Sequence, residues 1–290
     1  MTEPIKSVNG GDEGWGYVFT IEPGLEEDQV WSGTVLPPLE GLPANSIDIW
    51  QYCVTEMVNN AIDHSEGSWL MVVVRRRPSN TQVLVLDDGI GIFRKIKAAF
   101  NLEDEAQAIL ELSKGKLTTD PERHSGQGVF FTSRVLDKFS IFSHGVYFSH
   151  EATRPVDWIV PDDDNRDSST MVTMALDNNT ERTLKDVFDQ YSSGDNYDFS
   201  KTVVPLRLAK FGDEKLISRS QAKRALARVE RFKTVVFDFA GIQMIGQAFA
   251  DEIFRVWAKA HADVECTVID ASPDLRKMIA AVGPASNVKY

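Results

Sequence analysis

The sequence predicts an α/β protein in which an α+β sandwich is followed by a smaller α/β domain. Residues 52–65 have the apolar spacing of an amphipathic helix, and the apolar runs at 69–74 and 82–86 have the length and composition of strands. From residue 203 to residue 282, apolar strands alternate with amphipathic helices, which is typical of a layer with a mostly parallel sheet. A length of 290 residues is enough for two domains with separate cores.

The individual elements follow from local periodicity and from turn residues. In the first part we expect strands at 17–21, 69–74, 82–86, 139–143, 146–148 and 169–176, and helices at 46–65, 92–100, 103–112 and 127–136. In the second part we expect strands at 203–208, 234–239 and 264–269, and helices at 218–232, 247–260 and 273–282. These elements divide the chain into a loose N-terminus (1–15), a first domain (16–178), a linker (179–200) and a second domain (201–290).

Composition and charge exclude several classes of protein. An apolar content of 42% and a charged content of 26% are those of an ordinary globular protein. The net charge of −12 argues against a direct nucleic-acid partner and against binding to an anionic membrane surface. No apolar run approaches the ~18 residues of a membrane helix. Cys53 and Cys266 lie in core-like patterns and not in a metal motif, so we expect a reduced, cytoplasmic protein.

Polar side chains line one face of the helix at 52–65. Glu56, Asn60, Asp63 and His64 stand at i, i+4, i+7 and i+8, so they share one stripe. A carboxylate, an amide and a second carboxylate spaced in this way can hold a hydrated divalent cation and orient a water or a hydroxyl. Taken alone, such a stripe is more often a solvated helix face.

Two glycine-rich turns follow this helix along the chain. The strand at 82–86 runs into Asp87-Asp88-Gly89-Ile90-Gly91, and Gly126-Gln127-Gly128 opens the helix at 127–136. Glycine lets the backbone bend sharply and approach a ligand closely, and a helix start presents unpaired N–H groups to phosphate. Each turn alone is weak evidence, because plain glycine turns are common.

In this order, the three motifs resemble the Bergerat-fold ATP-binding domain shared by DNA gyrase, histidine kinases and mismatch-repair ATPases (GHKL). The resemblance implies that residues 16–178 form this domain, with ATP and Mg²⁺ as its cofactors. It also implies that the Asp87 carboxylate accepts a hydrogen bond from the adenine amine, with Gly89, Gly91 and Thr170 beside the base. The alternative for Asp87 is that it only caps a turn.

The same resemblance assigns the phosphate end of the site. Asn60 would be the Mg²⁺ ligand through its amide oxygen, and Glu56 would be the general base for a water or an acceptor hydroxyl. Asp63 matches a position that contacts the nucleotide or a structural water. Gly126 and Gly128 would present backbone N–H groups to the phosphates.

The polar stretch 113–123 has the composition of a mobile loop, and a loop at this place acts as a lid over the nucleotide in GHKL proteins. The residues in or beside it are Lys114, Lys116, Arg123, His124 and Ser125. One or two of them would meet the γ-phosphate, with Lys116 and Ser125 as the candidates. The alternative is that a solvated loop holds cations without a functional reason.

The second domain resembles the STAS fold of anti-sigma-factor antagonists. The resemblance rests on the strand at 234–239, the helix at 247–260 and the strand at 264–269. Those antagonists carry a phosphorylatable Ser at the start of the helix, where this chain has Gly246-Gln247-Ala248. Switching by phosphorylation at this place is therefore not expected. The whole pattern resembles a bacterial family of ATP-binding proteins with a STAS-like C-terminal domain of unknown function.

Two functions follow from these resemblances. The first is an Mg-ATP-binding regulator that hydrolyses ATP slowly or phosphorylates a Ser/Thr on a partner, with the STAS-like domain as relay. The second is a non-catalytic, ATP-dependent interaction module. Glu56 favours the first. A sensor histidine kinase fits less well, because none of the five His lies on a dimerising helical hairpin. We expect a protein partner, with a homodimer as one arrangement.

Overall fold

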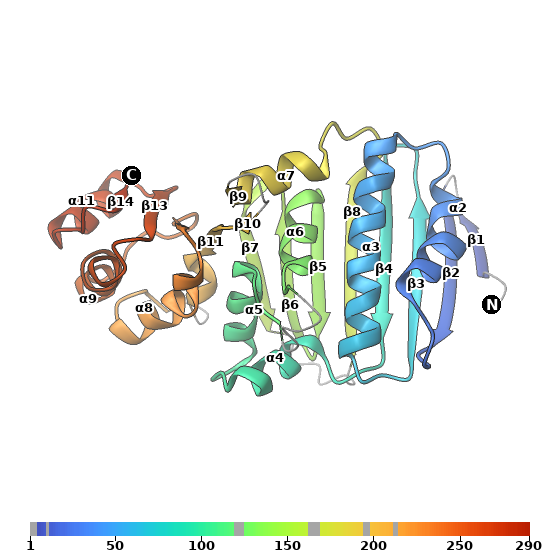
Figure 1. Cartoon of the computed structure of the whole chain (residues 1–290), viewed down its shortest axis with the longest axis horizontal. Coiled ribbons are helices and arrows are strands. Elements are labelled where there is room, and N and C mark those ends of the chain that lie inside the picture. The colour runs from blue at the N-terminus through green and yellow to red at the C-terminus, as the bar shows by residue number, and fades with distance from the viewer. Residues whose placement is uncertain (1–4, 10–11, 119–124, 162–168, 194–197, 211–213) are drawn as a thin grey trace. The chain divides into compact units, whose positions relative to one another are not determined.

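The computed structural model describes residues 5–9, 12–118, 125–161, 169–193, 198–210 and 214–290. Helices and strands are mixed along the chain, which confirms the expected α/β class (Figure 1). The chain forms two compact units. Unit 1 comprises Met1–Glu105, Thr118–Arg154 and Trp158–Val187, and unit 2 comprises Ala106–Leu117, Pro155–Asp157 and Phe188–Tyr290.

Unit 1 is built on an eight-stranded sheet with the order β1-β2-β3-β4-β8-β5-β6-β7, in which neighbouring strands are antiparallel. The strands are β1 (Ile5–Asn9), β2 (Asp12–Thr20), β3 (Trp69–Arg76), β4 (Asn80–Asp87), β5 (Lys138–Ser143), β6 (Val146–Glu151), β7 (Arg154–Pro161) and β8 (Thr170–Asp177). Because β8 lies between β4 and β5, its first residue, Thr170, pairs with Asp87 at the end of β4.

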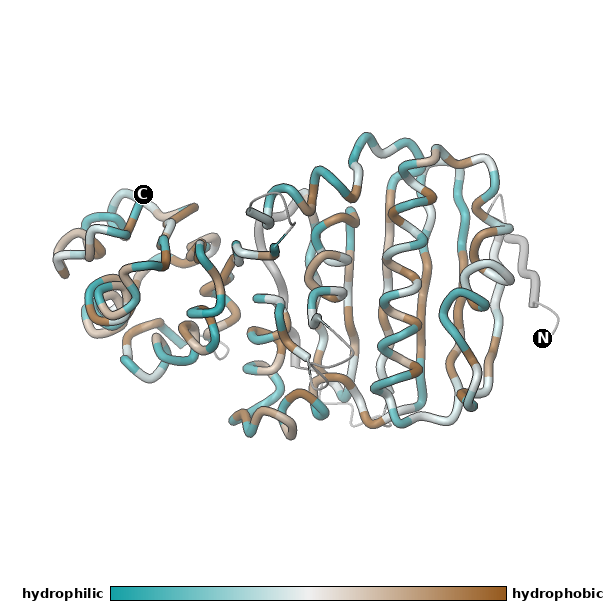
Figure 2. Tube along the Cα trace, in the orientation of Figure 1, coloured by the Kyte–Doolittle hydropathy of each residue, from teal (hydrophilic) through white to brown (hydrophobic). Residues whose placement is uncertain are grey.

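The helices α3 (Ala44–His64) and α6 (Gly128–Val135) lie on one face of this sheet (Figure 1). Burial alternates along the central strands, as it does when only one face of a sheet is covered. In β3, Leu70 and Val72 are buried, whereas Met71 and Val73 on the opposite face are half-buried. Along α3, hydrophilic and hydrophobic residues recur from turn to turn, as in an amphipathic helix (Figure 2). The remaining helical segments of this region are α1 (Glu27–Val30), η1 (Trp31–Val35), α2 (Leu36–Leu39) and α4 (Ile92–Phe100).

The N-terminus differs from the expectation of a loose segment at residues 1–15. Ile5–Asn9 and Asp12–Thr20 pair as the antiparallel strands β1 and β2, and β2 continues the sheet by pairing with β3. The Gly- and charge-rich composition of this segment gives little local strand signal. The edge of β3 supplies the hydrogen-bond partners that fix β2.

Unit 2 contains a parallel sheet of β11 (Lys201–Pro205), β12 (Thr234–Asp238), β13 (Glu265–Ile269) and β14 (Val288–Lys289). Its helical segments are α5 (Glu105–Lys114, from Ala106 onward), η2 (Leu206–Ala209), α8 (Arg219–Leu226), η3 (Val229–Arg231), α9 (Gln247–Ala250), η4 (Asp251–Trp257), α10 (Ala258–Ala260) and α11 (Pro273–Ala281). The helix expected at 247–260 is continuous but passes through a π-helical segment, η4.

Two segments lie differently from the expected domain limits. Residues 106–117, which we assigned to the first domain, pack within unit 2. The expected linker at 179–200 contains the helix α7 (Leu184–Tyr191) and the short paired strands β9 (Ser192–Ser193) and β10 (Asp198–Phe199). The limit between the units falls within α7, after Val187.

Candidate functional site

Asp87 and Thr170 come together at the end of the paired strands β4 and β8. Asp87 lies on the helix-covered face of the sheet and is only 5% exposed. Its Oδ1 accepts a hydrogen bond from Gly89 N (2.9 Å), and Thr170 Oγ1 accepts one from Ile92 N (3.0 Å). Burial raises the pKa of Asp87 to about 6, although the N–H groups of Gly89 and Thr170 oppose this rise. A buried carboxyl that titrates near neutrality is typical of functional sites.

The neighbouring carboxylate, Asp88, has a structural role where the end of β4 meets the start of β3. It accepts hydrogen bonds from Ser68 N (2.7 Å), Ser68 Oγ (2.6 Å) and Trp69 N (2.9 Å), which tie the start of β3 to the end of β4. Burial would raise the pKa of Asp88, but the hydrogen bonds from Ser68 and Trp69 outweigh it and hold the pKa below its usual value. Asp88 is thus engaged in the turn, and Asp87 is the carboxylate that faces the helices.

The bend at Gly89 and Gly91 packs closely against two other elements. A Cβ atom at Gly89 would collide with the carbonyl of Ser65 at the end of α3, and one at Gly91 would collide with the ring of His144. Gly91 also has a φ of +87°, which L side chains rarely adopt. The bend is fixed by hydrogen bonds from Ile90 N to Ser65 O (2.8 Å) and between His144 Nε2 and Ile90 O (2.9 Å).

The polar stripe of α3 starts from this bend. Glu56, Asn60 and Asp63 are all half-buried, and the seven residue steps from Glu56 to Asp63 span roughly 10 Å of helix. The C-terminal end of α3 meets the bend through Ser65, so Asp63 lies at the Asp87 end of the stripe. Glu56 lies at the far end.

Glu56 meets the second glycine turn. A Cβ atom at Gly128 would collide with the Glu56 carboxylate, so this carboxylate lies directly against the first residue of α6. A helix N-terminus carries a positive partial charge that favours an anion. Gly126 precedes the helix with a φ of +68°, and Ser125 beside it is exposed. Unit 1 therefore brings Glu56 together with the turn at 126–128.

Lys116 belongs to unit 2, where its Nζ lies 4.8 Å from the centroid of the Phe232 ring and 5.7 Å from that of Phe199. The amine also donates to Arg231 O (3.3 Å), and burial lowers its pKa. Lys116 is therefore not part of the residue set that unit 1 assembles. The lid residues 119–124 lie outside the described part of the chain.

The polar stripe offers an amide oxygen that could hold a magnesium ion together with phosphate oxygens and waters. Among the described residues, no group of three or more His, Cys, Asp or Glu side chains could hold a metal ion. Mg²⁺ commonly takes one or two protein oxygens and completes its octahedron with phosphate oxygens and waters. The Asn60 amide, half-buried between Glu56 and Asp63 on the stripe, fits this kind of ligation.

Sequence reasoning missed His144, Ser143 and Ser65. His144 and Ser143 lie against Gly91, and Ser65 lies against Gly89. The only local signal was the expected hairpin turn at His144-Gly145, which the structure confirms with φ angles of 50° and 70°. That signal predicts the turn but does not predict what the turn touches.

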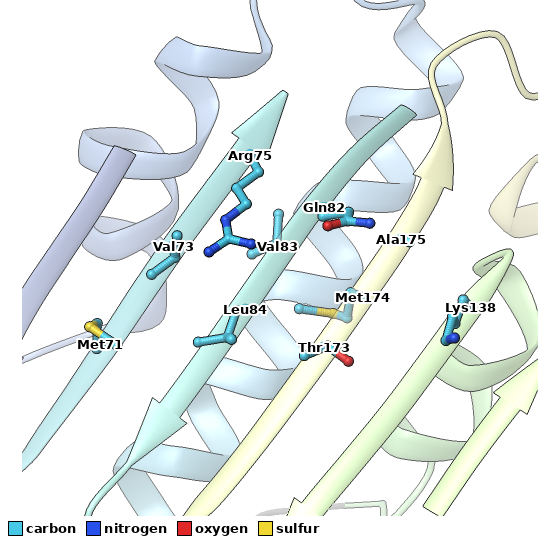
Figure 3. A pocket seen from close by; sticks show the side chains of 10 residues that line it. All are labelled: Met71, Val73, Arg75, Gln82, Val83, Leu84, Lys138, Thr173, Met174 and Ala175. Atoms are coloured by element: carbon cyan, nitrogen blue, oxygen red, sulfur yellow. The ribbon is translucent and has the colours of Figure 1, made fainter. Parts of the chain in front are cut away.

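A hollow of about 380 Å³ lies on the face of the sheet opposite to α3 (Figure 3). Met71, Val73 and Leu84 line it, with Arg75 and Lys138 among its charged side chains. None of the expected site residues contributes to it, because successive side chains of a strand point to opposite faces and Asp87 points to the helices. This hollow is therefore distinct from the site around α3.

Residues 221–276 match the family model of a STAS-like domain of unknown function (DUF4325). Unit 2 carries a STAS-like domain. The match begins within α8 and ends within α11, and it does not extend into unit 1. No curated protein matches the chain. In the described part of the chain, no helix combines the length and the apolar character needed to span a membrane.

The STAS-like domain lacks a hydroxyl at the helix start where anti-sigma-factor antagonists carry a phosphorylatable Ser. Here α9 begins at Gln247, with Gly246 as its N-cap residue and no side-chain cap. A Cβ atom at Gly246 would come within 2.7 Å of Ile217 Cα, so the backbone itself passes closely at this point. Neither Gly246 nor Gln247 has a side-chain hydroxyl that could accept a phosphoryl group.

Proposed function

We propose that this chain is an Mg-ATP-binding regulatory protein with a histidine-kinase-like ATP site in unit 1. It would hydrolyse ATP slowly, or transfer the terminal phosphoryl group to a Ser/Thr of a partner protein, and relay this state through the STAS-like domain. One observation carries the proposal: Asp87 and Glu56, from separate motifs, lie at the two ends of one polar stripe, each against a glycine turn.

Asp87 and the bend at 89–91 would receive the adenine. The ionised carboxylate is the stronger hydrogen-bond acceptor, so the exocyclic amine of adenine would favour the charged form that burial disfavours. Thr170 lies beside it, and Gly91 keeps a conformation that leaves no room for a side chain. The adenine would thus meet a small polar patch at the end of the paired strands β4 and β8.

Glu56 and Asn60 would serve the phosphates. The Asn60 amide oxygen would hold Mg²⁺, which when bound neutralises phosphate charge and makes phosphorus easier to attack. The Glu56 carboxylate would take the proton from a water or an acceptor hydroxyl. Its position against the first residue of α6 puts it where backbone N–H groups of Gly128 and its neighbours would bind phosphate.

Turnover distinguishes this function from an ATP-dependent interaction module without catalysis. We would measure Mg-ATP binding, phosphate release and labelling of proteins for the wild type, Glu56→Ala and Asn60→Ala. Asp48→Ala is the matched control, because Asp48 is an exposed carboxylate on α3, two turns before Glu56. Binding without phosphate release or protein labelling in the wild type would support the module. Absence of ATP binding would refute the proposed function altogether.

A further inference from the structure

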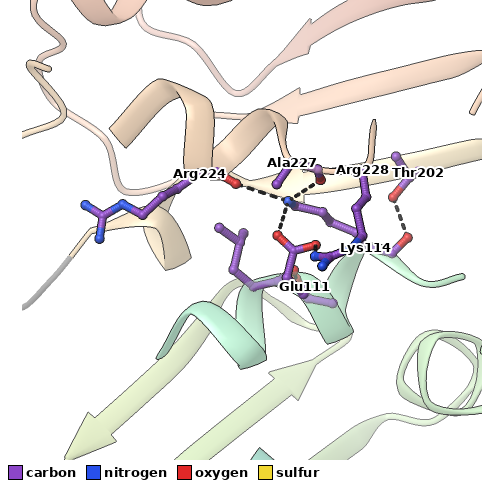
Figure 4. A network of polar contacts seen from close by, with 8 residues as sticks. Glu111, Lys114, Thr202, Arg224, Ala227 and Arg228 are labelled. Carbon is purple, nitrogen blue, oxygen red and sulfur yellow. Dashed lines mark hydrogen bonds and ion pairs between the residues drawn. The ribbon is translucent and has the colours of Figure 1, made fainter. Parts of the chain in front are cut away.

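An ionic network with a fully buried Lys–Glu pair holds α5 inside unit 2 (Figure 4). Lys114 is 1% exposed and Glu111 is 2% exposed, although both residue types are almost never buried unless they are paired. The Lys114 Nζ donates to Glu111 Oε1 (2.8 Å), and Glu111 Oε2 accepts from Arg228 Nη1 (2.9 Å). The ionic network defined by Glu111, Lys114 and Arg228 therefore joins α5 to the segment that follows α8.

Lys114 also closes the end of α8. Its Nζ donates to Ala227 O (2.9 Å) and to Arg224 O (3.3 Å), which are carbonyls at the C-terminus of this helix. The last carbonyls of a helix have no partner within the helix, and a cation at this end is favourable. With Glu111 as the third acceptor, all three donors of the ammonium group are used. Thr202 in β11 adds a hydrogen bond to Lys114 O (2.6 Å).

The segment that carries α5 is joined to unit 1 at both of its ends. The helix α4 starts directly after Gly91, and the chain leaves unit 1 after Glu105. It returns to unit 1 at Thr118, and the turn at Gly126 and Gly128 follows. Along the chain, the unit 2 segment 106–117 therefore lies between the two glycine turns of the candidate ATP site.

We propose that α5, locked by the ionic network, couples the ATP site of unit 1 to the STAS-like domain of unit 2. This inference rests on the proposed function, because it names how that site would be regulated. The network holds α5 as part of the STAS-like domain, so α5 cannot move without leaving charges buried and unpaired. A change at either glycine turn is therefore passed along the chain to α8 and β11. Coupling of this kind is reciprocal, so the network also influences the turns.

The test uses the full chain and amide hydrogen exchange followed by mass spectrometry. The main variant is Glu111→Leu/Lys114→Met, which replaces both fully buried charges with apolar side chains, while Arg228, whose side chain is 24% exposed, keeps access to solvent. Thr202→Val, which removes only the hydrogen bond to Lys114 O, is a milder second variant. The matched control is Lys277→Met, because Lys277 forms an i,i+3 pair with Asp274 that is fully exposed.

We expect the main variant to raise exchange at residues 126–131 at least several-fold without nucleotide, with a smaller rise in Thr202→Val and none in the control. With Mg-ATP, exchange at residues 219–231 should change in the wild type and stay constant in the main variant. Unchanged exchange at 126–131 in both network variants would overturn the coupling, whether or not ATP binds. Lack of ATP binding by the wild type would refute the proposed function. The coupling would still be tested in that case, by comparing amide exchange at 126–131 in the network variants and the wild type without nucleotide.

Discussion

Asp87→Asn is expected to raise the stability of the folded protein and to abolish its nucleotide binding. At about 1.36 kcal/mol for each pKa unit, the rise from 3.8 to about 6 makes an ionised Asp87 cost the folded protein about 3 kcal/mol. Below pH 3.8 the carboxyl is protonated in both states and the cost vanishes. It grows between 3.8 and about 6, because only the unfolded chain then releases the proton, and it is complete above about 6.

Asparagine is neutral at every pH and keeps an oxygen that can accept from Gly89 N. The free energy of unfolding of Asp87→Asn should therefore exceed that of the wild type by up to about 3 kcal/mol at pH 7.5, and by about half as much at pH 5. This gain corresponds to a melting temperature of unit 1 higher by roughly 6–12 °C. Nucleotide binding should be lost, because the charged acceptor for adenine is gone. Wild-type ATP affinity should rise as the pH increases through about 6.

Asp88→Asn is the matched control, and its expected effect on the stability of the fold is opposite to that of Asp87→Asn. Hydrogen bonds from Ser68 and Trp69 hold the pKa of Asp88 below its usual value, so its ionised form stabilises the fold above that value and the effect is lost on acidification. Asp88→Asn should lower the melting temperature at pH 7.5 and leave ATP binding intact. An Asp87→Asn variant less stable than the wild type would refute the reasoning on burial. Unchanged ATP affinity in that variant would refute the adenine assignment.

Further substitutions test the other site residues and the network. Glu56→Ala should stop phosphate release while ATP affinity, measured by calorimetry, stays within about threefold of the wild type; loss of binding would make Glu56 structural. Asn60→Ala should make ATP affinity insensitive to Mg²⁺, as seen in titrations with and without EDTA. Gly128→Ala should destabilise unit 1 in thermal melts because its Cβ would collide with the Glu56 carboxylate, and Glu56→Ala should relieve this loss in the double variant. Lys114→Met should cost about 3–5 kcal/mol of unit 2 stability in denaturant titrations, against under about 1 kcal/mol for Lys277→Met.

Local periodicity was sufficient for most of the elements. The helix that carries Glu56 and Asn60, the hairpin at His144-Gly145 and the alternation of strands and helices in unit 2 agree with the sequence analysis. The STAS-like domain is also supported by the match to residues 221–276. Helices and strands are predicted from apolar residues that recur with a period of 3.6 or 2 residues, and hairpins from turn residues. These signals lie between near neighbours, so a single sequence is enough to detect them.

The site was predictable only as separate motifs. The sequence places Glu56, Asp87 and Gly128 in three elements, and their spacing does not state which side chain meets which backbone. The structure decides that the Glu56 carboxylate lies against Gly128, and that Asp87, not Asp88, points to the helices. Both facts follow from strand register and from the packing of α3 beside α6, which are set by contacts between residues far apart in the chain.

The sequence by itself determined the α/β class, the order of the elements and the polar stripe of α3, because these depend on near neighbours along the chain. Only the tertiary structure decided that 106–117 packs within unit 2 and that Lys116 lies on aromatic rings there. The sequence analysis ended this helix at residue 112 and assigned Lys114 to a mobile loop, whereas the helix α5 extends to Lys114 and the side chains of Glu111 and Lys114 form a buried pair. Their burial depends on carbonyls at Arg224 and Ala227, more than a hundred residues away, and no local pattern encodes such a partner.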